Sequence, residues 1–439
     1  MGVTTVQNRY LNANVKFPGG ITEQEIERNI HEYFRDYSMV KNILILPPDM
    51  SRLNSYAGNI VNILYRYFHK TDIDIMPALG THIPMSENEI RKMYGFILYN
   101  RFIAHDWRND TVKIGEVPAS FVKEISEGYM DVGIDVEVNK RLLDRKYDLI
   151  ISVGQVVPHE VAGFANYTKN ILVGCGGRNM INQSHYLGAL YGMERIMGRI
   201  DNPVRKLYNY AAYKFLSHIP LVYILTVTTL DKTGLRVEAV SIGTGDEVFS
   251  ETAKVSQKKN LSFLHKPVKK VVVYLDPEKF RTTWVGNKSI YRTRMAIADG
   301  GEILVIAPAL QGCGEDLDND RLINRYGYLT RDQVIEAVSN DEDLRNNLSV
   351  AAHLIHGSSE GRFKITYAPG KMTKEQILSI KYDYLPLEEA LKMYDVNRLR
   401  DGFNTVGGEE IFYLSDPAIG LWTTRSRFEQ YSEGNLIKC

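Results

Sequence analysis

Four side chains in the sequence are of types that transfer protons, bind metals or attack electrophiles. They are His82, in the run ALGTHIPMSENEI, and His159, Lys169 and His185, in the run VVPHEVAGFANYTKNILVGCGGRNMINQSHYLG. Imidazole titrates near neutral pH and binds metals, and an amine acts as a nucleophile or neutralises an anion. Alone, each is as readily a packing or helix-capping residue, so their common position in the fold has to decide.

Short apolar runs alternate with helical patterns in the first part of the chain. The predicted strands are 42–48, 72–79 and 147–156, and the predicted helices are 56–70 and 86–95. Nearly continuous apolar strands that alternate with helices are typical of a parallel sheet covered on both faces. The pattern therefore predicts an α/β fold.

A second set of alternating elements begins at residue 268. Its predicted strands are 268–277, 300–309 and 364–369, and its predicted helices are 289–299, 331–338 and 387–394. A chain of 439 residues exceeds the usual size of one core. We therefore expect two α/β domains, each with a largely parallel sheet flanked by helices, and an active site in the cleft between them. The N-terminal catalytic and cofactor-binding domain would be 1–267, with 405–439 able to complete it, and the C-terminal domain 268–404.

Polar residues follow the first three predicted strands where each strand ends. Asp49 and Arg52 come after the first strand, Thr81 and His82 after the second, and His159 after the third. The carboxyl ends of parallel strands meet at one edge of a sheet, where ligands bind. An arginine fork suits a carboxylate or phosphate, and an aspartate can orient the arginine or a histidine. We therefore expect one site at this edge.

A glycine cluster follows Lys169 and leaves two roles open for that lysine. Gly174, Gly176 and Gly177 would let backbone N–H groups approach a phosphate, whose charge the lysine would neutralise. Lys169 could equally form a covalent bond to a cofactor. The glycine spacing matches neither a dinucleotide-binding nor a Walker fingerprint. His185 is expected to open the helix that follows.

The composition excludes several classes of protein. Lys plus Arg and Asp plus Glu both number 53, so no net charge points to a nucleic-acid partner. The three cysteines are far apart and form neither a disulfide framework nor a CxxC metal site, as in a reducing cytoplasm. The start of the chain is polar, and its longest apolar runs have the length of strands. We therefore expect a soluble cytoplasmic protein without a membrane partner.

Taken together, these residues resemble the lactate racemase family, the nickel-pincer-nucleotide-dependent racemases and epimerases of 2-hydroxy acids. The resemblance spans roughly residues 40–190. It rests on Asp49-x-x-Arg52, Gly80-Thr81-His82, Pro158-His159 with Gly163-Phe164, Lys169 ten residues after His159, and His185 sixteen residues later. After Phe164 the family has Ser-Gly-Gly-Arg-Lys, whereas this chain has Ala-Asn-Tyr-Thr before its lysine.

The resemblance implies a nickel cofactor, a pyridinium-3,5-dithio-type mononucleotide that holds the metal through a ring carbon and two sulfurs. His185 would supply the remaining nickel ligand, and Lys169 would tether the cofactor through a thioamide. The implied reaction inverts C2 of a 2-hydroxy acid by hydride transfer to the cofactor and back through a 2-keto acid. His82 and His159 would act as acid and base on opposite sides of the substrate.

The resemblance also implies substrate contacts and partners. Arg52 would hold the substrate carboxylate, with Asp49 supporting that geometry. In the second domain, Lys288 and Gln311 are the expected counterparts of a lysine and a glutamine that contact the substrate in the family. The implied partners are a small 2-hydroxy acid and the enzymes that build the cofactor, and a homodimer is a further expectation.

Two other functions remain open for the same residues. A zinc-dependent hydrolase would use the histidines as metal ligands and would contain zinc without a pyridinium chromophore. A noncatalytic homologue that binds a nucleotide or metabolite would keep its affinity after loss of His82 or His159.

Overall fold

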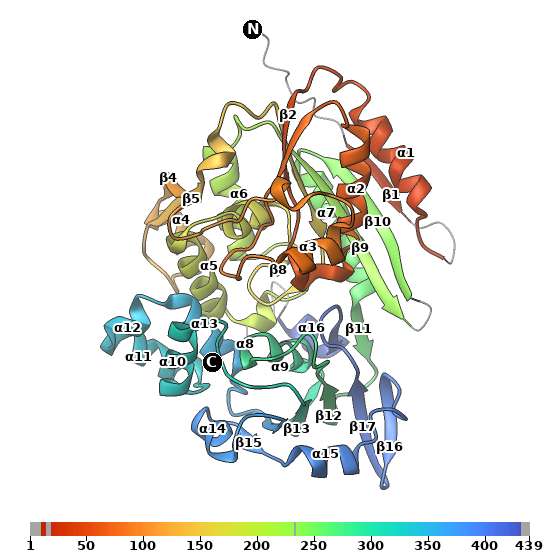
Figure 1. Ribbon diagram of the computed structural model, residues 1–439. Helices are drawn as coiled ribbons and strands as arrows, with labels where there is room; N and C mark the ends of the chain where they lie inside the picture. The colour runs from red at the N-terminus through yellow and green to blue at the C-terminus, as the bar shows by residue number, and fades with distance from the viewer. Residues whose placement is uncertain (1–9, 15–18, 232–233, 432–439) are drawn as a thin grey trace. The chain divides into compact units, whose positions relative to one another are not determined.

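The computed structural model describes residues 10–14, 19–231 and 234–431 and has the mixed α/β architecture expected from the sequence (Figure 1). The chain divides into two compact units. Unit 1 contains the residues up to Ser184 together with Gly198–Asn260. Unit 2 contains His185–Met197 together with the residues from Leu261 onward. The chain thus passes from unit 1 to unit 2 after Asn260, before the expected limit at 267, and no sequence pattern indicated that residues 185–197 belong with unit 2.

Unit 1 is built on a six-stranded sheet with the order β1-β10-β9-β6-β2-β3. β3, β2, β6 and β9 run parallel, whereas β10 and β1 are antiparallel to their neighbours. All residues of β6 are buried, as expected for a central strand covered on both faces. The strands are β1 (Leu11–Asn14), β2 (Asn42–Leu46), β3 (Asp72–Ile75), β6 (Leu149–Gln155), β9 (Leu221–Asp231) and β10 (Gly234–Gly243).

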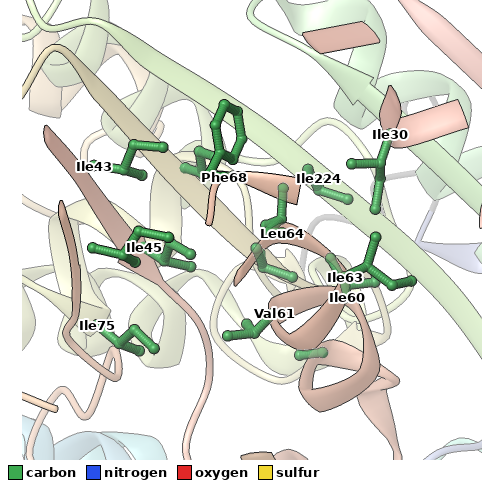
Figure 2. Close-up of a cluster of buried hydrophobic side chains, with 14 of the residues drawn as sticks. Ile30, Ile43, Ile45, Ile60, Val61, Ile63, Leu64, Phe68, Ile75 and Ile224 are labelled. Carbon is green, nitrogen blue, oxygen red and sulfur yellow. The ribbon is translucent and has the colours of Figure 1, made fainter. Parts of the chain in front are cut away.

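Helix α2 packs on this sheet through an apolar face with helical spacing. Its side chains lie against the isoleucines of β2 and β3 in the close-up of the core (Figure 2). Burying an aliphatic side chain of this size contributes about 1.5–3 kcal/mol, so this layer anchors the strands whose ends carry the site. The α2 residues in the layer are Ile60, Val61, Ile63 and Leu64, and the facing strand residues include Ile43, Ile45 and Ile75.

Three helices of unit 1, α1, α3 and α6, begin with a side-chain cap. Ser86, the first residue of the predicted helix 86–95, is the N-cap of α3, and its hydroxyl and the Glu89 carboxylate bond each other's backbone N–H. The α-helices are α1 (Glu23–Phe34), α2 (Ala57–Tyr67), α3 (Glu87–Tyr94), α4 (Ala119–Ile125), α6 (Pro203–Phe215) and α7 (Asp246–Asn260). Short helical turns are η1 (Met50–Ser55), η2 (Tyr99–Arg101), η3 (Lys140–Leu143) and η4 (Asn170–Gly174).

Two small antiparallel pairs and one long helix complete the description of this part. The pairs are β4 (Thr111–Val117) with β5 (Ile134–Asn139), and β7 (Pro158–His159) with β8 (Gly163–Phe164). Helix α5 (Arg178–Tyr191) belongs to unit 1 up to Ser184 and to unit 2 from His185.

Unit 2 contains a second six-stranded sheet with the order β15-β14-β13-β12-β17-β16, parallel except for β16. Its strands are β12 (Val268–Tyr274), β13 (Ile297–Ala307), β14 (Lys364–Pro369), β15 (Asp383–Tyr384), β16 (Gly402–Val406) and β17 (Glu409–Leu414). A separate parallel pair joins β11 (Leu261–Leu264) to β18 (Leu421–Thr424). The described residues from 405 onward thus belong to unit 2 instead of completing the first domain.

The helices of unit 2 confirm most of the predicted pattern. The predicted helix 289–299 ends early, at Thr293, because Ile297 already pairs with Val268 in the sheet. The helices are η5 (Met193–Arg195), α8 (Thr283–Gly286), α9 (Lys288–Thr293), α10 (Leu317–Tyr326), α11 (Arg331–Asn340), α12 (Glu342–Arg345), α13 (Leu348–Gly357), α14 (Lys374–Ser379), α15 (Leu387–Met393) and α16 (Arg425–Gln430). Within the described residues, no helix combines the length and the apolar character that crossing a bilayer requires.

Candidate functional site

Three neighbouring parallel strands of unit 1 end at the same edge of the sheet. β2 lies between β3 and β6, and its Ile45 is in register with Ile75 of β3 and Ile151 of β6. The segment after β2 contains Asp49 and Arg52, the segment after β3 contains His82, and the segment after β6 contains His159. The sheet order therefore confirms that the three strand ends lie next to one another at one edge of the sheet.

Asp49 and His82 form a hydrogen-bonded pair. Asp49 caps η1, and one carboxylate oxygen accepts the backbone N–H of Ser51 at 3.1 Å and its hydroxyl at 2.5 Å. The other oxygen lies 2.5 Å from His82 Nδ1. Burial acts to raise the pKa of Asp49, but the charge and hydrogen bond of His82 and the Ser51 hydroxyl outweigh it and lower the pKa to about 2. Because the ionised carboxylate favours a proton on Nδ1, Nε2 is the nitrogen at which His82 would take up a second proton.

His159 is held differently, in the hairpin of β7 and β8. The residue is buried, and its Nδ1 accepts the backbone N–H of Val161 at 3.1 Å. The neutral ring therefore has its proton on Nε2, which lies 3.8 Å from Glu160 Oε1. The local bonds thus favour Nδ1–H in His82 and Nε2–H in His159.

Arg52 interacts with two carboxylates, one of which the sequence analysis missed. Burial lowers the pKa of Arg52, whereas the charges of Glu160 and Asp49 act to raise it. An arginine so placed stays protonated and keeps a fork that suits a carboxylate. The one signal for Glu160 in the sequence is its position directly after His159.

Lys169 lies directly before η4 and is half-buried. Burial first, and then the positive charges of Arg52 and Arg205, lower the pKa of Lys169 to about 8, against the opposing charges of Glu160 and Asp49. About a tenth of such an amine is unprotonated at pH 7. Lys169 is therefore a better nucleophile than an exposed lysine.

The glycine cluster after Lys169 packs against the protein itself. The N–H of Gly176 bonds to Val173 O at 3.2 Å, and the N–H of Gly177 bonds to Glu137 O at 3.2 Å. A Cβ on Gly177 would lie 2.5 Å from Glu137 Oε2, and one on Gly174 would lie 2.7 Å from the Cβ of Ala78. These two N–H groups are thus already used inside the chain, so the geometry favours a packing role over the phosphate role considered above.

The start of α5 carries a carboxylate of the chain. Glu137 Oε2 accepts the N–H of Asn179 at 2.8 Å, in the first turn of the helix. A negative charge there stabilises the helix and would repel a phosphate. Because α5 begins at Arg178, His185 lies inside this helix. The expectation that His185 opens the helix is therefore wrong.

The remaining predicted site residues belong to unit 2. His185 is half-buried on α5, and Lys288 is half-buried at the first position of α9. Gln311 is exposed, and its N–H bonds to Arg281 O at 2.8 Å, beside the segment that leads into α8. Among the residues that the structure describes, no three His, Cys, Asp or Glu side chains are grouped as a metal site.

A family comparison extends this picture. A sequence model of the lactate racemase N-terminal domain matches residues 23–196. The lactate racemase of Thermoanaerobacterium thermosaccharolyticum is 25% identical over 293 residues, which are 62% of this chain and 61% of that protein. Residues 23–196 of the chain thus match the N-terminal domain of the lactate racemase family. It matches less than two thirds of the length of that racemase in sequence.

Two solved structures share the fold of this chain. A crystal structure of a Thermotoga maritima protein superposes with a TM-score of 0.80 at 22% identity. The superposition covers 94% of this chain and 100% of that one. The lactate racemase apoprotein from T. thermosaccharolyticum gives a TM-score of 0.66 at 19% identity, covering 92% and 93%. The match to the lactate racemase N-terminal domain includes the following predicted site residues: Asp49, Arg52, His82, His159, Lys169, Gly174, Gly176, Gly177 and His185.

Proposed function

We propose that this chain is a racemase or epimerase that inverts C2 of a 2-hydroxy acid with a nickel-pincer nucleotide. The similarity of residues 23–196 to the lactate racemase N-terminal domain, and of the chain to a lactate racemase, supports the reaction class. The observation that carries the proposal is the Asp49–His82 pair, at the sheet edge where His159 also follows its strand. This edge offers two imidazoles to one substrate.

His82 and His159 transfer the hydroxyl proton in the proposed reaction. Oxidation of a C2 hydroxyl needs a base for its proton, and re-formation of the hydroxyl from the other side needs an acid. His82 can take up a proton at Nε2 while Nδ1 stays bonded to Asp49. His159 offers the proton of Nε2 while Nδ1 accepts the N–H of Val161. General acid–base catalysis of this kind contributes about 10²–10⁴-fold.

Arg52 binds the substrate carboxylate. A guanidinium pairs with a carboxylate through two parallel N–H···O bonds, which fixes orientation as well as position. The charges of Glu160 and Asp49 favour the protonated form of Arg52. A substrate held in this way presents C2 in a fixed geometry to the histidines, which removes the entropy of finding it.

The side chains fit the cofactor that the family resemblance implies. An attachment point needs an unprotonated amine, and Lys169, with a pKa of about 8, supplies one near neutral pH. Nickel that arrives with donors from the nucleotide needs few protein ligands, and His185 is the imidazole assigned to it. A catalytic zinc, by contrast, needs three protein ligands, and no such group occurs in the described part of the chain. When bound, the nickel-pincer nucleotide supplies the hydride acceptor that side chains lack.

The test is to produce the chain together with the enzymes that build the cofactor and to follow single enantiomers of 2-hydroxy acids by chiral chromatography. We expect inversion at C2, bound nickel, and added mass on the peptide that contains Lys169. Cofactor-loaded protein that inverts none of the acids would contradict the proposal.

A matched pair of variants tests the nickel ligand. H185A should lose nickel. H218A, which removes an exposed histidine in the loop after α6, should keep it. Metal analysis of the two purified proteins gives the answer. Nickel retained at wild-type level in H185A would remove His185 from the ligand assignment.

A further inference from the structure

The loop that leads from Phe164 to Lys169 has a backbone that needs support. Asn166 and Tyr167 both have positive φ, 66° and 59°. Residues with a Cβ adopt this conformation reluctantly, and it persists where surrounding contacts enforce it. Part of the support is local, because Asn166 Oδ1 accepts the N–H of Tyr167 at 2.7 Å.

Arg205 of α6 supplies three further contacts to this loop. Its guanidinium donates to Phe164 O at 2.6 Å, to Asn166 O at 3.2 Å and to Thr168 Oγ1 at 3.0 Å. The Thr168 hydroxyl donates in turn to Asn209 Oδ1 at 2.9 Å, which leaves its lone pairs for Arg205. Arg205 is 3% exposed, so these bonds are shielded from water. One buried side chain thus spans the loop from its start to the residue before Lys169.

Aromatic contacts hold the same arrangement from α7. The guanidinium carbon of Arg205 lies 4.2 Å over the ring of Phe249. The ring of Tyr167 stacks on Phe249 as well, with centroids 5.3 Å apart and an interplanar angle of 13°. The Tyr167 hydroxyl donates to Asp246 Oδ1 at 2.9 Å. Arg205 and the strained Tyr167 are therefore fixed by a shared partner.

The positive charge of Arg205 also favours an unprotonated amine on Lys169. Its three loop acceptors are two carbonyls and a hydroxyl, all uncharged, so the loop does not neutralise it. The pKa of Lys169 is lowered to about 8, first by burial and then by the positive charges of Arg52 and Arg205. A loop that swung outward would lose both the burial and the nearby charges.

We propose that Arg205 is a positioning residue, which holds the loop 164–168 so that Lys169 presents an unprotonated amine for attachment of the cofactor. The inference rests on the proposed function, in which Lys169 carries that cofactor. Arg205 acts through the loop backbone and through its charge, without contact with the substrate.

The test measures the reactivity of Lys169 in the cofactor-free full chain. Acetylation by trace acetic anhydride is followed by peptide mass spectrometry between pH 6 and pH 11. The midpoint of the pH profile reports the pKa of the Lys169 amine. We expect a wild-type midpoint of about 8. In R205M the midpoint should rise by about one pH unit or more, which is about tenfold less unprotonated amine at pH 7. R205K keeps a charge but cannot span the three acceptors, so its midpoint should lie between these values.

A matched control and a milder variant complete the test. K206M removes the next, exposed side chain of α6, which pairs with Asp201, and should leave the midpoint unchanged. A structural role alone would lower the melting temperature of R205M and leave its midpoint at about 8, which would overturn the proposal. If R205M does not fold, T168V decides, because it removes the hydroxyl that Arg205 bonds. Its midpoint should rise by a smaller amount, and an unchanged midpoint would equally overturn the proposal.

Cofactor loading separates this inference from the proposed function. A raised midpoint in R205M combined with unmodified Lys169 in co-produced wild-type protein would support the role of Arg205 and contradict the proposed cofactor. Modified Lys169 combined with an unchanged midpoint in R205M would do the reverse.

Discussion

The two histidine corners of unit 1 hold the same side chain in different ways. At the first corner, the Asp49 carboxylate lies 2.5 Å from Nδ1 of His82, whose side chain is 39% exposed. At the second corner, the N–H of Val161 bonds to Nδ1 of His159, whose side chain is 9% exposed. A proton on Nε2 of His82 leaves its partner in place, whereas a proton on Nδ1 of His159 breaks a hydrogen bond. The bonding partner thus separates two residues of identical type.

This difference matches the two proton transfers that an inversion requires. One imidazole has to accept the hydroxyl proton, and the other has to offer a proton from the opposite side. The bond to Asp49 favours Nε2 of His82 as the proton acceptor, and the bond to Val161 favours a proton on Nε2 of His159. In the reverse direction His159 has to rearrange its contact with Val161, so kcat need not be the same in the two directions at one pH.

The largest expected effect comes from removing either histidine. In cofactor-loaded protein, H82Q and H159Q should each lower kcat by about 10²–10⁴-fold in both directions, because each turnover uses both groups. Nickel content should stay at the wild-type level in both. The measurement is kcat from each enantiomer together with metal analysis. Near-normal activity in either variant would break the assignment of that corner, and a binding protein without catalysis would keep its affinity in both.

The carboxylates should differ in a second, smaller effect. D49N keeps the shape of Asp49 but no longer favours the proton on Nδ1 of His82, so we expect kcat to fall by about 10²-fold, the low end of the range for general acid–base catalysis. E160Q weakens a contact of 3.8 Å to His159 and removes a charge near Arg52, and a contact of that length is weak, so the loss in kcat should stay below about 10-fold. Parallel kinetics of the two variants make the comparison. Equal losses would mean that the corners do not differ in the proposed way.

The smallest expected effect is on stability in acid. The pKa of Asp49 falls from its ordinary 3.8 to about 2 in the folded chain. The folded carboxylate binds its proton less readily than the unfolded one, so its contribution is full above about pH 4 and is lost as the pH falls to about 2. A shift of this size corresponds to roughly 2 kcal/mol in the free energy of unfolding, about half of it between pH 5 and pH 3.

Urea unfolding at pH 5 and pH 3 measures this contribution. Wild-type protein should lose about 1 kcal/mol more than D49N over that interval. E160Q serves as the control from the other corner and should follow the wild type. A loss of the same size in D49N and the wild type would contradict the low pKa of Asp49.

The strand-end residues were predictable because the fold places them by a general rule. Nearly continuous apolar runs mark β2, β3 and β6 in the sequence, and parallel strands bring their carboxyl ends to one edge. The polar residues after each run were therefore found without knowledge of their contacts. The cap at Ser86 was predictable for a similar reason, since its pattern is local.

The contacts that change the roles of residues are long-range and leave no local pattern. Gly177 looked available to a phosphate, but its N–H bonds to Glu137, forty positions earlier in the chain. Arg205 stands on α6 and bonds to Phe164 across 41 positions. Glu160 was missed for another reason, because an acid beside a histidine is common and its effect depends on Arg52 being near.

The most direct test of the proposed function follows the hydrogen at C2. A single enantiomer of a 2-hydroxy acid, deuterated at C2, is incubated in ordinary water with protein whose Lys169 is shown by mass spectrometry to carry the cofactor. We predict inversion with the deuterium kept at C2, while the hydroxyl proton exchanges through His82 and His159. No inversion by loaded protein, or inversion with loss of the deuterium to water, would contradict the proposed function.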